Sequence, residues 1–117
     1  MRQFTASVLL GFLSACGSAP YRPLPPIADK LPSDVRNAEP EFDRRVETAF
    51  PLGSSEEKAI TELDRLGFEV SPQGADGYRS ADIKRGGMIC QTLWSVRWKA
   101  EAGQLRDIFG VYGFRCP

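Results

Sequence analysis

The apolar positions of the chain follow a helical pattern just before its midpoint. Phe42, Val46 and Phe50 are spaced four residues apart, so they share one face of a short helix, which Pro51 ends. Because the segment before this helix is rich in proline, we expect the folded part of the chain to start near Glu41.

A second helical pattern follows directly. Ser54 precedes Glu57 by three residues, which is the spacing of a capping box, and Gly67 offers a left-handed end. These features predict a helix over about residues 55–66. Glu56 and Glu57 are a candidate acid pair, although their place in the first turn favours a solvated face that complements the helix dipole. The apolar stripe consists of Ala59, Ile60, Leu63 and Leu66.

The rest of the chain alternates between apolar and polar residues, as β-strands do. A short strand begins at Phe68 and ends at Pro72, and a glycine-rich loop over residues 73–77 follows it. Residues 78–84 form a second strand, and Arg85-Gly86-Gly87 is typical of a tight turn.

Two longer strands complete the chain, over about residues 89–99 and 105–116, with a turn around Gly103. In the first, Trp94, Val96 and Trp98 share a face by period two, which favours core packing over stacking on a sugar or a base. The element order predicts an α+β fold, in which two N-terminal helices pack on a four-stranded antiparallel sheet. Leu93, Phe109 and Val111 would then lie on the opposite face, where a partner or a second layer of helix could dock.

Cys90 and Cys116 are expected to form a disulfide that also sets the pairing of the last two strands. If they face each other, all the apolar pairs fall on one face, whereas a shift by one residue would put the cysteines on opposite faces. Closing this loop of about 27 residues should stabilise the domain by on the order of 3.5 kcal/mol. Two reduced, packed cysteines are the alternative. The facing pairs would be Trp98–Ile108, Trp94–Tyr112 and Thr92–Phe114.

The amino terminus has the pattern of an export signal. Arg2 precedes an apolar run over about residues 4–13, which is too short to span a bilayer. The run ends in Leu13-Ser14-Ala15-Cys16, which resembles the lipobox of bacterial lipoproteins. The alternatives are an ordinary signal peptide with an incidental cysteine, or a short buried helix of a cytosolic protein.

The resemblance to a lipoprotein has consequences for processing and location. It implies that residues 1–15 are removed as a signal peptide and that Cys16 carries a diacylglycerol and usually a further fatty acid such as palmitate. Two or three acyl chains give stable membrane anchoring, whereas one is marginal. Gly17 stands where an aspartate would favour the inner membrane, so the resemblance implies the periplasmic face of the outer membrane.

A proline-rich segment follows Cys16. Six of the nine prolines lie between Pro20 and Pro40, and this density argues against regular structure. We therefore expect a semi-extended tether over residues 16–40 and a small α+β domain over residues 41–117. Pro23-Leu24-Pro25-Pro26 also has the composition of a ligand for a proline-recognition domain.

The predicted domain is similar in layout to the fold shared by the BamE (SmpA/OmlA) family of outer-membrane assembly lipoproteins and β-lactamase inhibitory protein. The similarity rests on Phe50-Pro51-Leu52-Gly53-Ser54 leading into a helix, then Gly67-Phe68, then a tryptophan-rich strand. It implies a binding domain over about residues 42–117, either in envelope assembly or in the inhibition of an enzyme.

The composition of the chain argues against several kinds of catalytic, metal-binding and nucleic-acid-binding site. The chain has no histidine, which removes Ser-His-Asp and Cys-His nucleophiles and most zinc sites. Its formal net charge is +0, which gives no support to a nucleic-acid partner. Asp76 and Asp82 lack the spacing of a calcium loop, and Lys84-Arg85 is more typical of a charged hairpin tip than of an anion site. We expect no catalytic residues, metal or cofactor.

These observations favour a non-enzymatic lipoprotein whose domain binds another component of the cell envelope. An inhibitor or immunity protein acting on a periplasmic enzyme is the alternative, with the loop over residues 73–77 as its contact surface.

Overall fold

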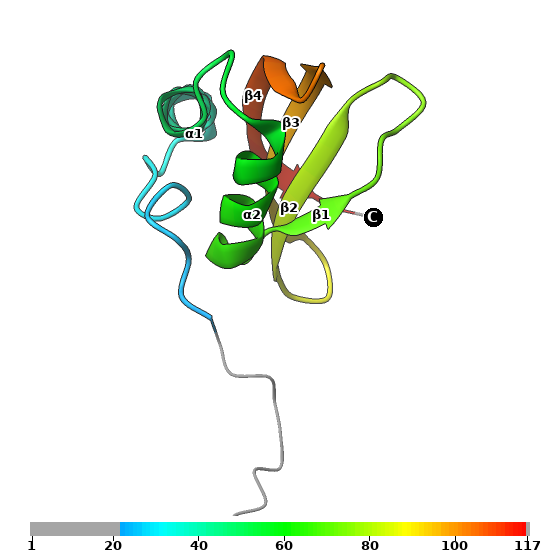
Figure 1. Cartoon of the computed structure of the whole chain (residues 1–117). Coiled ribbons are helices and arrows are strands. Elements are labelled where there is room, and N and C mark those ends of the chain that lie inside the picture. The colour runs from blue at the N-terminus through cyan, green and yellow to red at the C-terminus, as the bar shows by residue number, and fades with distance from the viewer. Residues whose placement is uncertain (1–21, 117) are drawn as a thin grey trace, which may run out of the picture.

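The computed structural model of the 117-residue chain describes residues 22–116. The expected signal peptide and Cys16 lie outside the described residues. Two helices precede a four-stranded antiparallel sheet with strand order β1-β2-β3-β4 (Figure 1). The predicted α+β architecture is thus confirmed, with the helices between residues 35 and 66. The elements are α1 (Val35–Ala49), α2 (Glu56–Leu66), β1 (Glu69–Ser71), β2 (Arg79–Gly86), β3 (Gln91–Glu101) and β4 (Gln104–Arg115).

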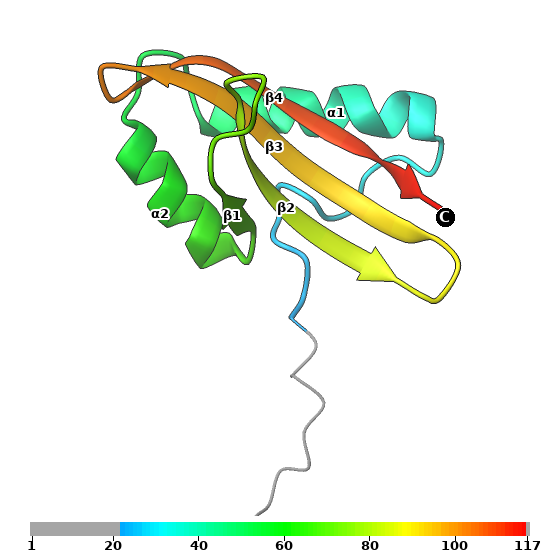
Figure 2. The ribbon, with the colours of Figure 1, turned by 90° about the vertical axis from the view of Figure 1, so that its right-hand side faces the viewer.

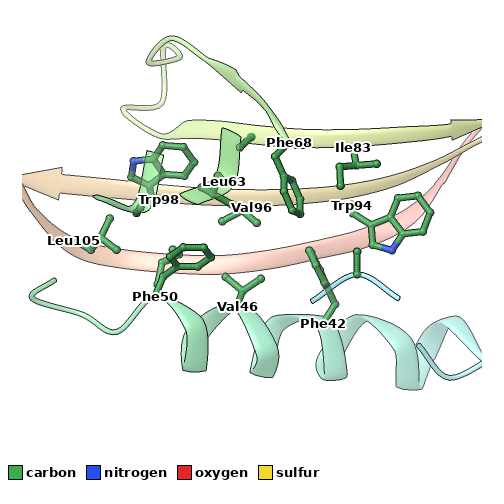
Figure 3. Close-up of a cluster of buried hydrophobic side chains, with 14 residues drawn as sticks. Phe42, Val46, Phe50, Leu63, Phe68, Ile83, Trp94, Val96, Trp98 and Leu105 are labelled. Atoms are coloured by element: carbon green, nitrogen blue, oxygen red, sulfur yellow. The ribbon is translucent and has the colours of Figure 1, made fainter. Parts of the chain in front are cut away.

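The helices and the sheet form two layers. Helix α1 runs along β4, and α2 lies beside β1 at the other edge of the sheet (Figure 2). Both helices contribute to a single apolar core (Figure 3). Within residues 22–116, no helix covers the other face of the sheet (Figure 2). The buried members of the core are Ala28, Phe42, Val46, Phe50, Ala59, Leu63, Phe68, Ala81, Ile83, Trp94, Val96, Trp98, Leu105 and Ile108.

Helix α1 begins earlier than the sequence pattern predicts. Asp34 caps it by accepting a hydrogen bond from the Arg36 amide at 3.0 Å, and Val35 is its first residue. The expected start near Glu41 is therefore wrong. Ala38 is fully buried and extends the four-residue spacing backwards, while Pro40 is exposed and lies in the second turn. A proline on the exposed side of a helix costs one hydrogen bond but leaves the packed face intact.

The segment before α1 also packs on the domain, so the expected tether does not extend to residue 40. Pro25 and Ala28 are buried, and the carbonyls of Pro26 and Asp29 accept hydrogen bonds from Arg45 of α1 at 3.1 and 2.6 Å. Glu41 in turn accepts a hydrogen bond from Arg45 at 3.0 Å. This ion pair therefore orients the guanidinium that holds the segment against α1.

Helix α2 has the predicted extent but a different cap. The hydroxyl of Ser55 accepts from the Lys58 amide at 3.2 Å, whereas the hydroxyl of Ser54 donates to the Pro51 carbonyl. The expected capping role of Ser54 is therefore wrong by one residue. Gly67 ends the helix with φ 98°, a left-handed conformation that favours glycine, as predicted.

The predicted register of β3 and β4 is confirmed. Trp98 faces Ile108, Trp94 faces Tyr112 and Thr92 faces Phe114. A β-bulge between Lys99 and Ala100 shifts the pairing by one residue near the Ala102-Gly103 turn, where both residues have positive φ.

The turn between β2 and β3 differs from the prediction. Strand β2 continues through Arg85 and Gly86, and β3 starts only at Gln91, so the connection consists of residues 87–90. Gly86 has φ 137°, and an added Cβ would lie 2.6 Å from the Cys90 carbonyl oxygen. Only glycine fits at this position, and the chain turns two residues later than Arg85-Gly86-Gly87 suggests.

Helix α1 shields the outer edge of β4. The amides of Gly110 and Tyr112 donate to the carboxylates of Asp43 and Glu39 at 2.9 and 3.4 Å. The helix comes so close that a Cβ on Gly110 would lie 2.8 Å from a ring carbon of Phe42 and 3.0 Å from a methyl of Val46. Gly110 is therefore the residue that allows the helix to approach the strand.

Replacing Gly110 with alanine should destabilise the domain. The methyl group would overpack the buried contact with Phe42 and Val46, at a cost of about 1–3 kcal/mol in the free energy of unfolding. Denaturant titration measures this cost. Gly113→Ala on the same strand is the matched control, because no atom lies within 4 Å of its added Cβ. Equal unfolding midpoints for the two variants would contradict the close approach.

The pair of Glu41 with its arginines should make stability depend on pH. Hydrogen bonds from Arg44 and then Arg45 lower the pKa of Glu41 from 4.5 to about 2. A lowered pKa contributes stability that is fully present above pH 4.5 and is lost as the pH falls toward 2. The melting temperature of the wild type should thus exceed that of Glu41→Gln near neutral pH and approach it near pH 2. Glu47→Gln, on an exposed position of the same helix, is the control, and a difference between wild type and Glu41→Gln that persists at pH 2 would rule out this pair as its source.

Candidate functional site

The uncovered face of the sheet carries a shallow groove across β2, β3 and β4. Because side chains alternate along a strand, the residues facing away from the core gather here. Leu93 and Val111, which were predicted to lie on this face, supply its apolar part, and Ser95 is a polar residue only 6% exposed. The groove has a volume of about 230 Å³. Its lining residues are Ser80, Asp82, Lys84, Leu93, Ser95, Arg97, Val111 and Arg115.

The groove holds polar atoms that lack partners among residues 22–116. Oδ1 of Asp82 and Nε of Arg97 are shielded from solvent, and neither has a hydrogen-bond partner there. Leaving a shielded polar atom unpaired costs free energy unless a ligand supplies the missing bond. Three cationic side chains line the groove against the carboxylate of Asp82, and one of them also pairs with Asp76, so an excess of positive charge remains that is complementary to an acidic segment. The cations are Lys84, Arg97 and Arg115.

Tyr78, which follows the loop over residues 73–77, contacts the groove through Arg97, whose guanidinium carbon lies 5.7 Å from the centroid of the tyrosine ring. Its ring packs edge-on against Phe109 with centroids 5.5 Å apart, and the ammonium of Lys99 lies 4.5 Å from the ring centroid. Its hydroxyl donates to Asp107, and this hydrogen bond raises the pKa of Tyr78. The side chain is therefore held in place across the strands rather than free to swing.

Asp76 connects the same loop to the groove. Its carboxylate accepts the Tyr78 amide at 3.0 Å and pairs with Arg97 at 2.7 Å. The backbone hydrogen bond is the main cause, and the Arg97 charge a further one, of the lowered pKa of Asp76. The loop thus orients the arginine that lines the groove.

The two tryptophans belong to the core, as predicted. Trp98 is fully buried and Trp94 is 7% exposed, so neither offers a face to a sugar or a base. The indole of Trp98 donates to Glu56 at 2.8 Å beside a second hollow of about 320 Å³, which Arg79 also lines. Glu57 is exposed, so the two residues of the candidate acid pair differ: Glu56 accepts a partly buried hydrogen bond, and Glu57 faces solvent.

The structure separates the other charged candidates. Lys84 lines the groove, whereas Arg85 donates to the Arg22 carbonyl at 2.7 Å, so the two do not form one anion site. Asp76 pairs with Arg97, while Asp82 lies in the groove. Within the described part of the chain, no three Asp, Glu or Cys side chains gather as a candidate metal site.

The sulfur atoms of Cys90 and Cys116 lie 2.03 Å apart, at disulfide distance, with Cα atoms 4.2 Å apart. The pair follows directly on the predicted strand register, because the adjacent residues Gln91 and Arg115 face each other. It joins the connection after β2 to the end of β4.

Comparisons with known protein families, with characterised proteins and with solved structures each find no match to this chain. Across residues 22–116, no helix has the length and apolar character needed to cross a membrane. The layout similarity to the BamE and inhibitory-protein fold accordingly stays a prediction, and the site rests on its own geometry.

Removing the cysteine pair should lower stability strongly. The double variant Cys90→Ser, Cys116→Ser loses the constraint on a loop of about 27 residues, which is worth on the order of 3.5 kcal/mol in the chain-entropy model. Denaturant titration of the variant and of the wild type, each with and without reductant, measures this. Reductant should move the wild-type midpoint to that of the variant and leave the variant unchanged. A wild type that is insensitive to reductant at every denaturant concentration would contradict the stabilising role of the bond.

Proposed function

We propose that this chain is a bacterial lipoprotein, anchored through Cys16 to the periplasmic face of the outer membrane, with a non-enzymatic domain that binds an envelope protein. The support for the anchor is Leu13-Ser14-Ala15-Cys16 after a short apolar run. The packed domain already begins near Leu24, so few residues separate it from the proposed lipid. The domain would therefore work close to the membrane.

The observation that carries the binding role is the uncovered groove with its unpaired Asp82 oxygen. A partner segment that lies across the strands could donate a backbone amide or hydroxyl to Asp82 and place an apolar side chain on Leu93 and Val111. Acidic side chains beside it would meet Lys84 and Arg115. The proposed partner is thus a protein segment that combines acidic and apolar residues.

One observation favours the alternative, an inhibitor or immunity protein. The exposed loop over residues 73–77 has a defined shape, because the Gly74 amide donates to the Tyr78 carbonyl at 2.8 Å and the Gln73 side chain donates to the Gly77 carbonyl at 3.0 Å. A preorganised protruding loop loses little entropy when it enters a cleft. An inhibitor would use this loop, and a scaffold protein would use the groove.

The anchor and the binding surface can be tested in the same cells. Labelling with a radioactive fatty acid should mark the wild type and not Cys16→Ala. A photo-crosslinking amino acid at Leu93 should give one dominant adduct, and adding Asp82→Ala should reduce its yield by about tenfold, a loss of about 1.4 kcal/mol in binding.

Two controls make the result specific. The same crosslinker at Thr61, on the exposed side of α2, should give no such adduct. Placed at Ala75, it reports on the loop, so an adduct there and none at Leu93 would favour the inhibitor. Equal fatty-acid labelling of wild type and Cys16→Ala would reject the lipid anchor.

A further inference from the structure

The connection between β2 and β3 presents two large apolar side chains to solvent. Met88 is 99% exposed and Ile89 is 77% exposed, and these two residues are called the apolar tip below. Ile89 was expected to open the third strand, but that strand begins at Gln91, which leaves Ile89 in the connection. Phe114, near the end of β4, adds a third exposed apolar side chain at 58%.

The cysteine pair holds the apolar tip in an outward position. Cys90 follows Ile89 directly and is joined to Cys116 after β4. On the other side, Gly86 is packed against the Cys90 carbonyl so closely that no side chain fits. Both ends of the connection are thus held in place, and Met88 and Ile89 lie between them with their side chains in solvent.

The apolar tip lies on the same side of the domain as the start of the described chain. Arg85, three residues before Met88, donates to the Arg22 carbonyl at 2.7 Å. In both views the start of the coloured chain and the β2–β3 connection lie toward the lower end of the molecule (Figures 1 and 2). From Cys16 to Arg22 the chain can span at most about 20 Å. A lipid on Cys16 would therefore hold this end within reach of the bilayer.

Basic side chains outnumber acidic ones near the apolar tip, although the carboxylate of Asp82 shares the groove with Lys84 and Arg115. The sequence from Ile83 to Ala100 contains no acidic residue. Lys84, Arg115 and Arg22 are exposed at this end, although the chain as a whole has a net charge of +0. Exposed apolar side chains bordered by cations suit a surface of anionic lipid headgroups over acyl chains.

From these four features we infer that the apolar tip inserts into the headgroup region of the membrane that carries the lipid anchor. The inference rests on the proposed function, because the anchor supplies the proximity. Anchor and apolar tip together would make a two-point attachment that orients the domain.

Photolabelling of the acylated full-length protein tests this directly. The protein is purified from membranes and placed in vesicles of phosphatidylethanolamine and phosphatidylglycerol that contain a diazirine-bearing phospholipid. After illumination, label should appear on the peptide with Met88 and Ile89. In the double variant Met88→Ser, Ile89→Ser, the amount of label on this peptide should fall by about tenfold, while the mass of the acyl groups on Cys16 stays the same. Leu52, 63% exposed near the opposite end of the sheet, should remain unlabelled, and Leu52→Ser should leave the label at Met88 unaffected.

The outcomes separate the two proposals. An acylated Cys16 with no label on the apolar tip, or with equal label on Leu52, overturns the insertion and leaves the lipoprotein assignment standing. If the double variant loses label but also melts at a different temperature, the single variant Met88→Ser is measured in its place. An unchanged label in that variant, with a wild-type melting temperature, also overturns the insertion. An unmodified Cys16 overturns the anchor and with it this inference.

Discussion

The pairing of β3 with β4 is the constraint on which the rest of the structure depends. With Trp98 opposite Ile108, alternate residues in the middle of both strands face the core, and the residues between them form the groove on the other face. The same register brings Cys90 to Cys116 at the end of the hairpin. A shift of one residue in this register would bury Arg97 and expose Trp98. The core, the groove and the cysteine pair therefore all depend on the same register.

The two faces of the sheet differ in their contacts: on one face a helix packs closely against the backbone, and on the other face polar side chains contact one another. Helix α1 reaches β4 because Gly110 has no side chain, and Phe42 and Val46 occupy the space that this opens. Across the sheet, Tyr78, Arg97 and Asp107 are linked by hydrogen bonds and charge contacts above the strands. One face is thus closed by apolar contact, while the other keeps charged groups available to a ligand.

Much of the sheet could be predicted from sequence, because a period of two leaves few choices once two cysteines must meet. The start of α1 could not, since proline density says nothing about which side of a helix Pro40 occupies. The N-cap of α2 is Ser55 and not Ser54. The sequence could not distinguish them, because two adjacent serines have the same chemistry and only the backbone conformation decides which one caps the helix. The groove was anticipated from Leu93 and Val111, but the unpaired Asp82 oxygen depends on three strands at once and leaves no local pattern. Ile89 was misplaced because apolar character alone does not separate a strand from an exposed connection.

The two carboxylates of α1 that accept the Gly110 and Tyr112 amides have a consequence for self-association. An open strand edge presents unpaired backbone groups with which a neighbouring copy can extend the sheet. Here the long edge strand has part of its amides occupied by side chains of its own chain. The opposite edge, β1, is only three residues long and stops before Pro72. Pairing of a second copy with the sheet is therefore hindered at both edges.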